Sequence, residues 1–230
     1  MYWEEPRVEE AKAPSSSMVD VAFAITCKVL PVDHAHALRR ALEAALPWLG
    51  AEERAGIHAI HGAESGNGWI RPDSEAGALL QLSRRTRMVL RVPTERVDEV
   101  RALEGQTLDI AGYPLQVGAV SVRALQPSAT LFARYVVSEQ DENEQAFLDR
   151  VAGSLRRMGV PPRKLLCGKS HVIVTPEGPL QTRSLMVADL DAADSVRLQE
   201  QGIGPGRKLG CGLMVPYKGI KPVRAEGEDK

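Results

Sequence analysis

The spacing of apolar side chains predicts alternating strands and helices in the first half of the chain. Residues 19–30 alternate and are rich in β-branched side chains, which is typical of a strand. Leucines and alanines then recur at helical spacing from residue 38 to residue 49, after Asp33 as the predicted N-cap. The elements predicted next are a strand at 78–83, a strand at 87–93, a helix at 94–103 capped by Thr94, and a hairpin with a closing strand at 107–125. The predicted order is β-α-β-β-α-β.

The second half repeats this order without visible sequence identity to the first. Its predicted elements are a strand at 129–137, a helix at 142–160, strands at 163–176 and 178–190, a helix at 191–201 that begins near Asp191, and a last strand at 213–219. Such an order is typical of the ferredoxin-like arrangement. We therefore expect an α+β protein of two tandem ferredoxin-like domains. Their predicted bounds are 18–124 and 129–220, with a flexible leader at 1–17 and a flexible tail at 221–230.

Composition and charge indicate where in the cell the protein works more clearly than which reaction it catalyses. The 230 residues carry a formal net charge of -1, so any nucleic-acid surface must come from local clusters of basic residues. The three cysteines lie far apart, which favours a reducing cytoplasm over a disulfide framework. Residues 19–30 are too short and too polar to span a bilayer, and the acidic leader lacks the basic start of a signal peptide. We expect a cytoplasmic protein with no membrane partner.

A glycine-rich segment at 202–212, GIGPGRKLGCG, lies between the last predicted helix and the last predicted strand. It lacks the glycine spacing of a dinucleotide fingerprint, and it follows a helix where that motif would precede one. Another segment, RKLLCGKS, is followed by a predicted strand instead of the helix that a P-loop requires. The pattern that does fit is Gly-apolar-Gly, five residues, Gly-apolar-Gly. Its alternative interpretation is a structural turn whose Ile203 and Cys211 pack inward.

With this loop in the second unit, the chain from Met18 to about Ile220 resembles the CRISPR-associated repeat-cleaving endoribonucleases of the RAMP superfamily, and its type I members in particular. The resemblance implies metal-independent cleavage of precursor CRISPR RNA by the ribose 2′-hydroxyl, giving 2′,3′-cyclic phosphate and 5′-hydroxyl ends without a cofactor. It also implies retention of the mature crRNA beside other subunits of a surveillance complex. The alternatives are a non-catalytic crRNA-binding subunit of the same superfamily and a regulatory ferredoxin-like protein without an RNA partner.

Basic side chains are segregated from acidic ones, as a phosphate-binding surface requires. Arg91 lies just beyond the cluster formed by Arg84, Arg85 and Arg87. Aromatic side chains on which bases could stack are scarce, which favours recognition of RNA shape and phosphates. Glycines without a Cβ let backbone N–H groups approach a phosphate. The predicted RNA-binding residues are Arg84, Arg85 and Arg87; Arg156, Arg157, Arg163 and Lys164; Arg207 and Lys208 at the tip of the glycine-rich segment; and Gly202, Gly204, Gly206, Gly210 and Gly212.

Histidine suits the proton transfers of this reaction because its pKa lies near neutrality. The stretch from Ile57 to Gly62 fits the apolar-His-three residues-Gly form found in the family, so His58 is the first catalytic candidate and His61 the second. We expect His34 and His36 at an exposed helix start and His171 within a strand. Lys169 is the candidate catalytic cation. A zinc site at His58 and His61 lacks an evident third ligand, so we predict no metal.

Overall fold

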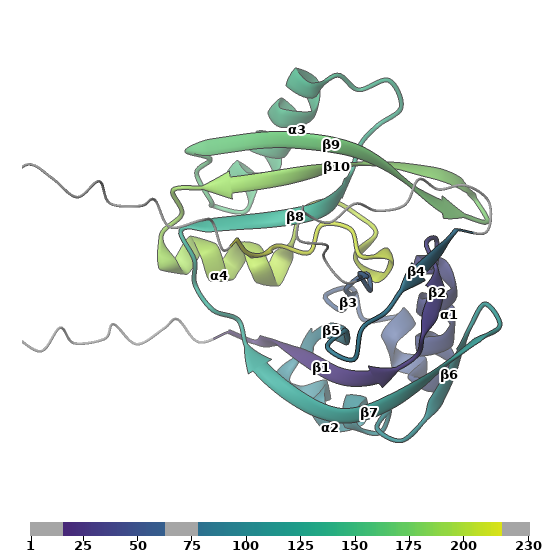
Figure 1. Ribbon diagram of the computed structural model, residues 1–230. Coiled ribbons are helices and arrows are strands. Elements are labelled where there is room, and N and C mark those ends of the chain that lie inside the picture. Colours follow the sequence, from purple (N-terminus) through teal and green to yellow (C-terminus); the bar gives the residue numbers. More distant parts are fainter. Residues whose placement is uncertain (1–15, 63–77, 218–230) are drawn as a thin grey trace, which may run out of the picture.

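The computed structural model describes residues 16–62 and 78–217. In the first half, an antiparallel five-stranded sheet has the order β3-β5-β1-β7-β6 (Figure 1). Its strands are β1 (Met18–Thr26), β3 (Gly56–Ile57), β5 (Arg87–Pro93), β6 (Thr107–Ile110) and β7 (Tyr113–Ala124). The helical elements are α1 (Ala35–Ala45), η1 (Pro47–Gly50), η2 (Thr94–Arg96) and α2 (Val97–Arg101). Leu38 and Leu42 of α1 are fully buried in the core of this half, as their spacing predicts.

The predicted strand at 78–83 does not belong to this sheet. It forms β4 (Leu79–Gln81), which pairs with β2 (Val29–Pro31) in a separate two-stranded sheet. Leu30 and Leu80 face each other there and are both buried. The short strand β3 occupies the sheet edge beside β5 instead, in a stretch between residues 49 and 78 for which the sequence predicts no helix or strand.

Two predicted helix caps are wrong. The N-cap of α1 is His34 instead of Asp33, and α2 begins after Arg96 instead of Thr94. None of the four helical elements in this half uses a side-chain cap at its start. In the second half the prediction holds, because Asp191 caps α4 by accepting a hydrogen bond from the Asp194 N–H.

The second half contains an antiparallel four-stranded sheet with the order β11-β8-β10-β9. Its elements are β8 (Thr130–Val137), α3 (Glu144–Arg157), β9 (Lys164–Thr175), β10 (Gly178–Ala188), α4 (Ala192–Gln201), η3 (Arg207–Leu209) and β11 (Val215–Pro216). Phe147, Val151 and Leu155 of α3 lie four residues apart and are fully buried. The α+β class is therefore confirmed, and the chain passes from one half to the other between β7 and β8 (Figure 1).

Ser16 and Ser17, at the end of the predicted leader, contact the second half. The backbone N–H of Ser17 donates to the Glu200 carboxylate at 2.7 Å, and the Ser16 hydroxyl donates to the same oxygen. Residues 1–15 of the leader and residues 218–230 lie outside the described residues.

Candidate active site

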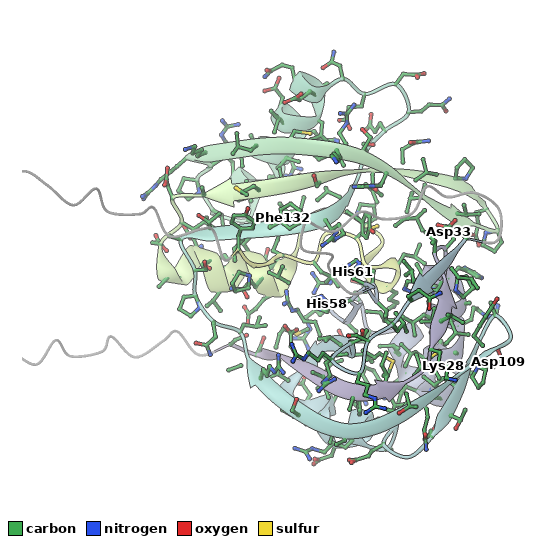
Figure 2. All side chains as sticks on the ribbon, viewed as in Figure 1. Lys28, Asp33, His58, His61, Asp109 and Phe132 are labelled. Carbon is green, nitrogen blue, oxygen red and sulfur yellow. The ribbon has the colours of Figure 1, made fainter. Side chains whose placement is uncertain are left out.

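A groove of about 440 Å³ lies between the two halves. Figure 2 shows His58 and His61 between the halves, with Phe132 on the side of the second half. The other polar or aromatic residues that line the groove are Ser83, Arg85, Thr86, Arg87, Arg134 and Tyr135. Within the described ranges, the lining contains three arginines and no carboxylate, so it favours an anionic ligand.

His58 follows β3 directly and is fixed by its backbone, whose N–H donates to the Val89 carbonyl at 2.9 Å. Its Nε2 atom is buried, has no hydrogen-bond partner among the described residues, and lies 3.6 Å from Oδ1 of Asp20. Burial lowers the pKa of His58, the Asp20 carboxylate raises it in part, and Arg91 and Arg207 lower it further. The net lowering keeps the imidazole neutral near neutral pH, which is the form that accepts a proton.

Asp20 and Arg91 form a buried ion pair beneath His58. They face each other across β1 and β5, and the Arg91 guanidinium donates to both carboxylate oxygens at 2.8 and 2.9 Å. Arg91 also donates to the carbonyls of Gln199 and Met214, so it joins the two halves. Burial raises the pKa of Asp20, but the neighbouring His58 ring and the hydrogen bonds and charge of Arg91 hold it well below its usual range. Arg91 therefore has a structural role, although the sequence places it beside an RNA-binding cluster.

His34 is buried, which contradicts the expected exposed helix start. Its Nε2 accepts a hydrogen bond from the Ile60 N–H at 3.1 Å, and its Nδ1 lies 2.9 Å from the Pro31 carbonyl. Because a backbone N–H can only donate, Nε2 must be unprotonated and Nδ1 must carry the proton. His34 thus fixes the backbone between His58 and His61.

His61 lines the groove near the ring of Tyr135. The ring of Tyr135 is 6.3 Å from that of His61 and 5.5 Å, edge to face, from that of His171 on β9. Tyr135 is almost completely buried and lies on β8, so a tyrosine from the second half reaches the histidine segment of the first half. The sequence offered no signal for this contact, because Tyr135 sits in an ordinary strand pattern.

The glycine-rich segment holds the two halves together. Its Arg207 guanidinium donates to the backbone carbonyls of Arg54, Glu200 and Gln201, and Lys208 donates to the carbonyl of Gly50. Burial and the charge of Arg91 lower the pKa of Arg207 to about 10. The expected tip of free cations is therefore replaced by contacts with the first half, since these donors already have partners.

The glycines of this segment also make close contacts. Gly202, Gly204, Gly206, Gly210 and Gly212 all have positive φ, and Ile203 and Cys211 are buried as in the structural alternative. A Cβ on Gly210 would lie 3.1 Å from the backbone nitrogen of Ala59, the residue after His58. The segment therefore packs directly against the backbone of the first catalytic candidate.

The model of one protein family, described as Cas6 Crispr, matches residues 19–219. The chain belongs to the Cas6 family. It is 33% identical over 210 residues to the CRISPR-associated endonuclease Cas6 of Myxococcus xanthus strain DK1622, covering 91% of this chain and 86% of the relative. The resemblance to CRISPR-associated endoribonucleases that process precursor crRNA is thereby confirmed.

Solved structures agree at the level of the fold. One, described as a Cas6-related gene from Pyrococcus furiosus, has a TM-score of 0.61 at 12% identity and covers 87% of this chain and 99% of its own. Another, described as an RAMP protein binding different RNA substrates, has a TM-score of 0.57 at 14% identity, with coverage of 87% and 99%. At such low sequence identities, these structures support the shared fold alone, and no residue role is transferred from them.

The remaining predicted residues divide by position in this Cas6 fold. Arg84, Arg85 and Arg87 are exposed before and at the start of β5, and the latter two line the groove. The other predicted basic residues are exposed but are not among those that line the groove: Arg156, Arg157, Arg163, Lys164 and Lys169. In residues 16–62 and 78–217, no group of three or more His, Cys, Asp or Glu side chains could hold a metal ion. None of the described helices is long and apolar enough to cross a membrane.

Proposed function

We propose that this Cas6 chain binds CRISPR repeat RNA in the groove between its halves and cleaves precursor CRISPR RNA there. The observation that carries the proposal is the position of His58 and His61 on one segment inside a groove lined by arginines. The names of the relatives support it, since one is a CRISPR-associated endonuclease and another an RAMP protein that binds RNA. Cas6 chemistry and an anionic substrate are consistent with this lining.

The proposed reaction is a transesterification that requires no metal. His58 takes the proton of the ribose 2′-hydroxyl, the 2′-oxygen forms a bond to phosphorus, and the bond to the 5′-oxygen breaks. The leaving 5′-oxygen then takes a proton, for which His61 is the candidate acid. The products are a 2′,3′-cyclic phosphate and a 5′-hydroxyl, so no water is consumed and no cofactor is needed.

Arginine side chains are proposed to hold the phosphate as negative charge develops on it. Arg85 and Arg87 enter the groove from the first half and Arg134 from the second, so a phosphate between them meets cations from both sides. Arg134 was not anticipated from the sequence. Lys169 remains a predicted catalytic cation, and the cluster from Arg156 to Lys164 a predicted extension of the RNA surface.

We also infer that both halves are ferredoxin-like units, with bounds at 18–124 and 129–220. In the second half, the sheet order β11-β8-β10-β9 places the four strands as 4-1-3-2 in order of sequence. In the first half, β7, β1, β5 and β3 take the corresponding places in that order, with β6 added at the edge beside β7.

We propose that the product stays bound as crRNA in a cytoplasmic type I surveillance complex with other subunits.

The test is cleavage of a labelled CRISPR repeat RNA in EDTA by the wild type, His58→Ala and His61→Ala. His36→Ala is the matched control, because His36 lies on α1 and does not line the groove. We expect the wild type and the control to cut, His58→Ala to lose the cut, and His61→Ala to be slowed. A wild type that binds the repeat without cutting it would instead support the non-catalytic subunit, and a cut that survives both groove substitutions would reject this assignment.

A further inference from the structure

Among residues 16–62 and 78–217, Asp20 is the carboxylate that lies beside His58, and the cleavage chemistry above gives it no role. It lies on β1, at the centre of the first sheet, with its side chain 21% exposed. A carboxylate between a histidine and a buried arginine needs an explanation, because burying charge is costly unless it is paired. The ion pair with Arg91 satisfies Asp20 electrostatically but does not account for its approach to His58.

The geometry distinguishes the two ring nitrogens of His58. Nε2 is buried and points toward Oδ1 of Asp20, whereas the side chain as a whole remains 18% exposed. The exposed part of the side chain therefore excludes Nε2, and His58 is among the residues that line the groove. At 3.6 Å the contact is longer than a hydrogen bond, as is common for catalytic contacts before substrate binds.

The carboxylate itself is held rigidly. Arg91 donates to both of its oxygens, and the carbonyls of Gln199 and Met214 fix the guanidinium in turn. A fixed carboxylate next to one nitrogen of an imidazole favours the tautomer with the proton on that nitrogen. The other nitrogen is then left with a free lone pair.

We propose that Asp20 is a positioning residue that keeps the proton of His58 on Nε2, so that unprotonated Nδ1 faces the groove and receives the proton of the 2′-hydroxyl. The proposal rests on the proposed function for its catalytic consequence but not for the tautomer. Asp20 also links His58 in the first half to the backbone of the second half, because its partner Arg91 donates to the carbonyls of Gln199 and Met214. Rigid association of the halves thereby becomes a condition for correct orientation of the base.

The charged groups around His58 set the sign of the effect. Asp20 on β1 raises its pKa, while Arg91 on β5 and Arg207 in η3 lower it. Removing the carboxylate leaves only the two cations, so the pKa of His58 falls. If His58 acts as a base, its active neutral form then persists to lower pH, and the acid limb of the rate profile moves with it.

The first experiment uses the unaltered protein. Nitrogen chemical shifts of a ¹⁵N-histidine-labelled sample report the tautomer of each neutral imidazole, with His58→Ala identifying the His58 signal. We expect the proton of His58 on Nε2. A proton on Nδ1 would overturn the proposal, whatever the cleavage assays show.

The second experiment compares Asp20→Asn with Glu200→Gln, a control that weakens the contact of Ser16 and Ser17 with the second half without touching His58. For Asp20→Asn at saturating repeat RNA we expect a loss of rate on the order of 10–100-fold, with an unchanged Kd. The acid limb should move to lower pH, and Glu200→Gln should leave it in place. A rate loss without movement of the limb would reduce Asp20 to a structural residue.

These outcomes separate the two proposals. A wild type that does not cut, or a cut that survives both His58→Ala and His61→Ala, rejects the proposed function, while the tautomer still decides whether Asp20 keeps the proton of His58 on Nε2. If Asp20→Asn fails to fold, the tautomer of the wild type decides alone.

Discussion

Gly210 offers the sharpest test of how the glycine-rich segment acts. In the Gly210→Ala variant the new Cβ would lie 3.1 Å from the nitrogen and 3.2 Å from the Cβ of Ala59. These contacts are tighter than normal packing, so Ala59 must shift by a few tenths of an ångström. The φ of +84° adds about 1–2 kcal/mol of backbone strain for any residue with a Cβ. Because Ala59 follows His58, the shift reaches the catalytic candidate directly.

Gly204→Ala is the matched control. Its φ of +71° imposes similar strain, but a Cβ there meets no described atom within 4 Å. The two variants should therefore lose a similar free energy of unfolding from strain, about 1–2 kcal/mol. That loss corresponds to a melting temperature lower by about 2–8 °C for a chain of this size. Any further difference between them comes from the contact with Ala59.

The assay separates rate from affinity. Single-turnover cleavage at saturating repeat RNA should fall about tenfold or more for Gly210→Ala, because small misplacements of a reacting group are costly, while Kd stays near the wild-type value. Gly204→Ala should keep the wild-type cleavage rate. The larger side chain of Gly204→Val should weaken RNA binding if the RNA follows the glycine-rich segment. Equal rates for Gly210→Ala and Gly204→Ala would refute a role of the segment in positioning His58.

Further expectations concern charge. The Arg85→Ala/Arg87→Ala double variant should bind repeat RNA more weakly, and the slope of log affinity against log salt concentration should fall by about one per arginine. The Arg156→Ala/Arg157→Ala variant, whose arginines do not line the groove, should change this slope less. Equal slopes for the two variants would place the main RNA path elsewhere. Arg207→Ala should lose about 1–3 kcal/mol in urea unfolding, and Arg207→Lys should not restore it, since one ammonium cannot replace the fork that contacts three carbonyls. Asp20, whose pKa is depressed on folding, contributes stability that is present above the unfolded pKa of about 4 and is lost below it. The difference in unfolding free energy between wild type and Asp20→Asn should therefore shrink as pH falls from about 5 to about 2, and a constant difference would contradict the ion pair.

The sequence predicted the elements whose signals are local. Asp191 caps α4 through its own side chain, and the leucines of α1 repeat at the helical period, so neither depends on distant contacts. The short strand β3 could not be predicted, because only pairing of Gly56 and Ile57 with β5 makes it a strand. The same holds for β4, whose partner β2 lies about fifty residues earlier in the chain.

The candidate site was predictable where a histidine fits a local pattern. His58 and His61 stood out because the stretch from Ile57 to Gly62 fits the form found in the resembling family, and both histidines line the groove. Arg91 and Arg207 were misread because an arginine looks the same in sequence whether it binds phosphate or carbonyl oxygens inside the protein. Asp20 gave no signal, since its meaning depends on the cross-strand register that sets it opposite Arg91.

The proposed mechanism requires that the groove direct a ribose 2′-hydroxyl at the scissile phosphate. Its most direct test is a repeat RNA with a single 2′-deoxy nucleotide on the 5′ side of the scissile bond, incubated with the wild-type protein in EDTA. We predict that this RNA binds with the Kd of the unmodified repeat and stays intact, while the unmodified repeat is cut to a 2′,3′-cyclic phosphate. Cleavage of the deoxy-substituted RNA at the same bond would contradict the mechanism.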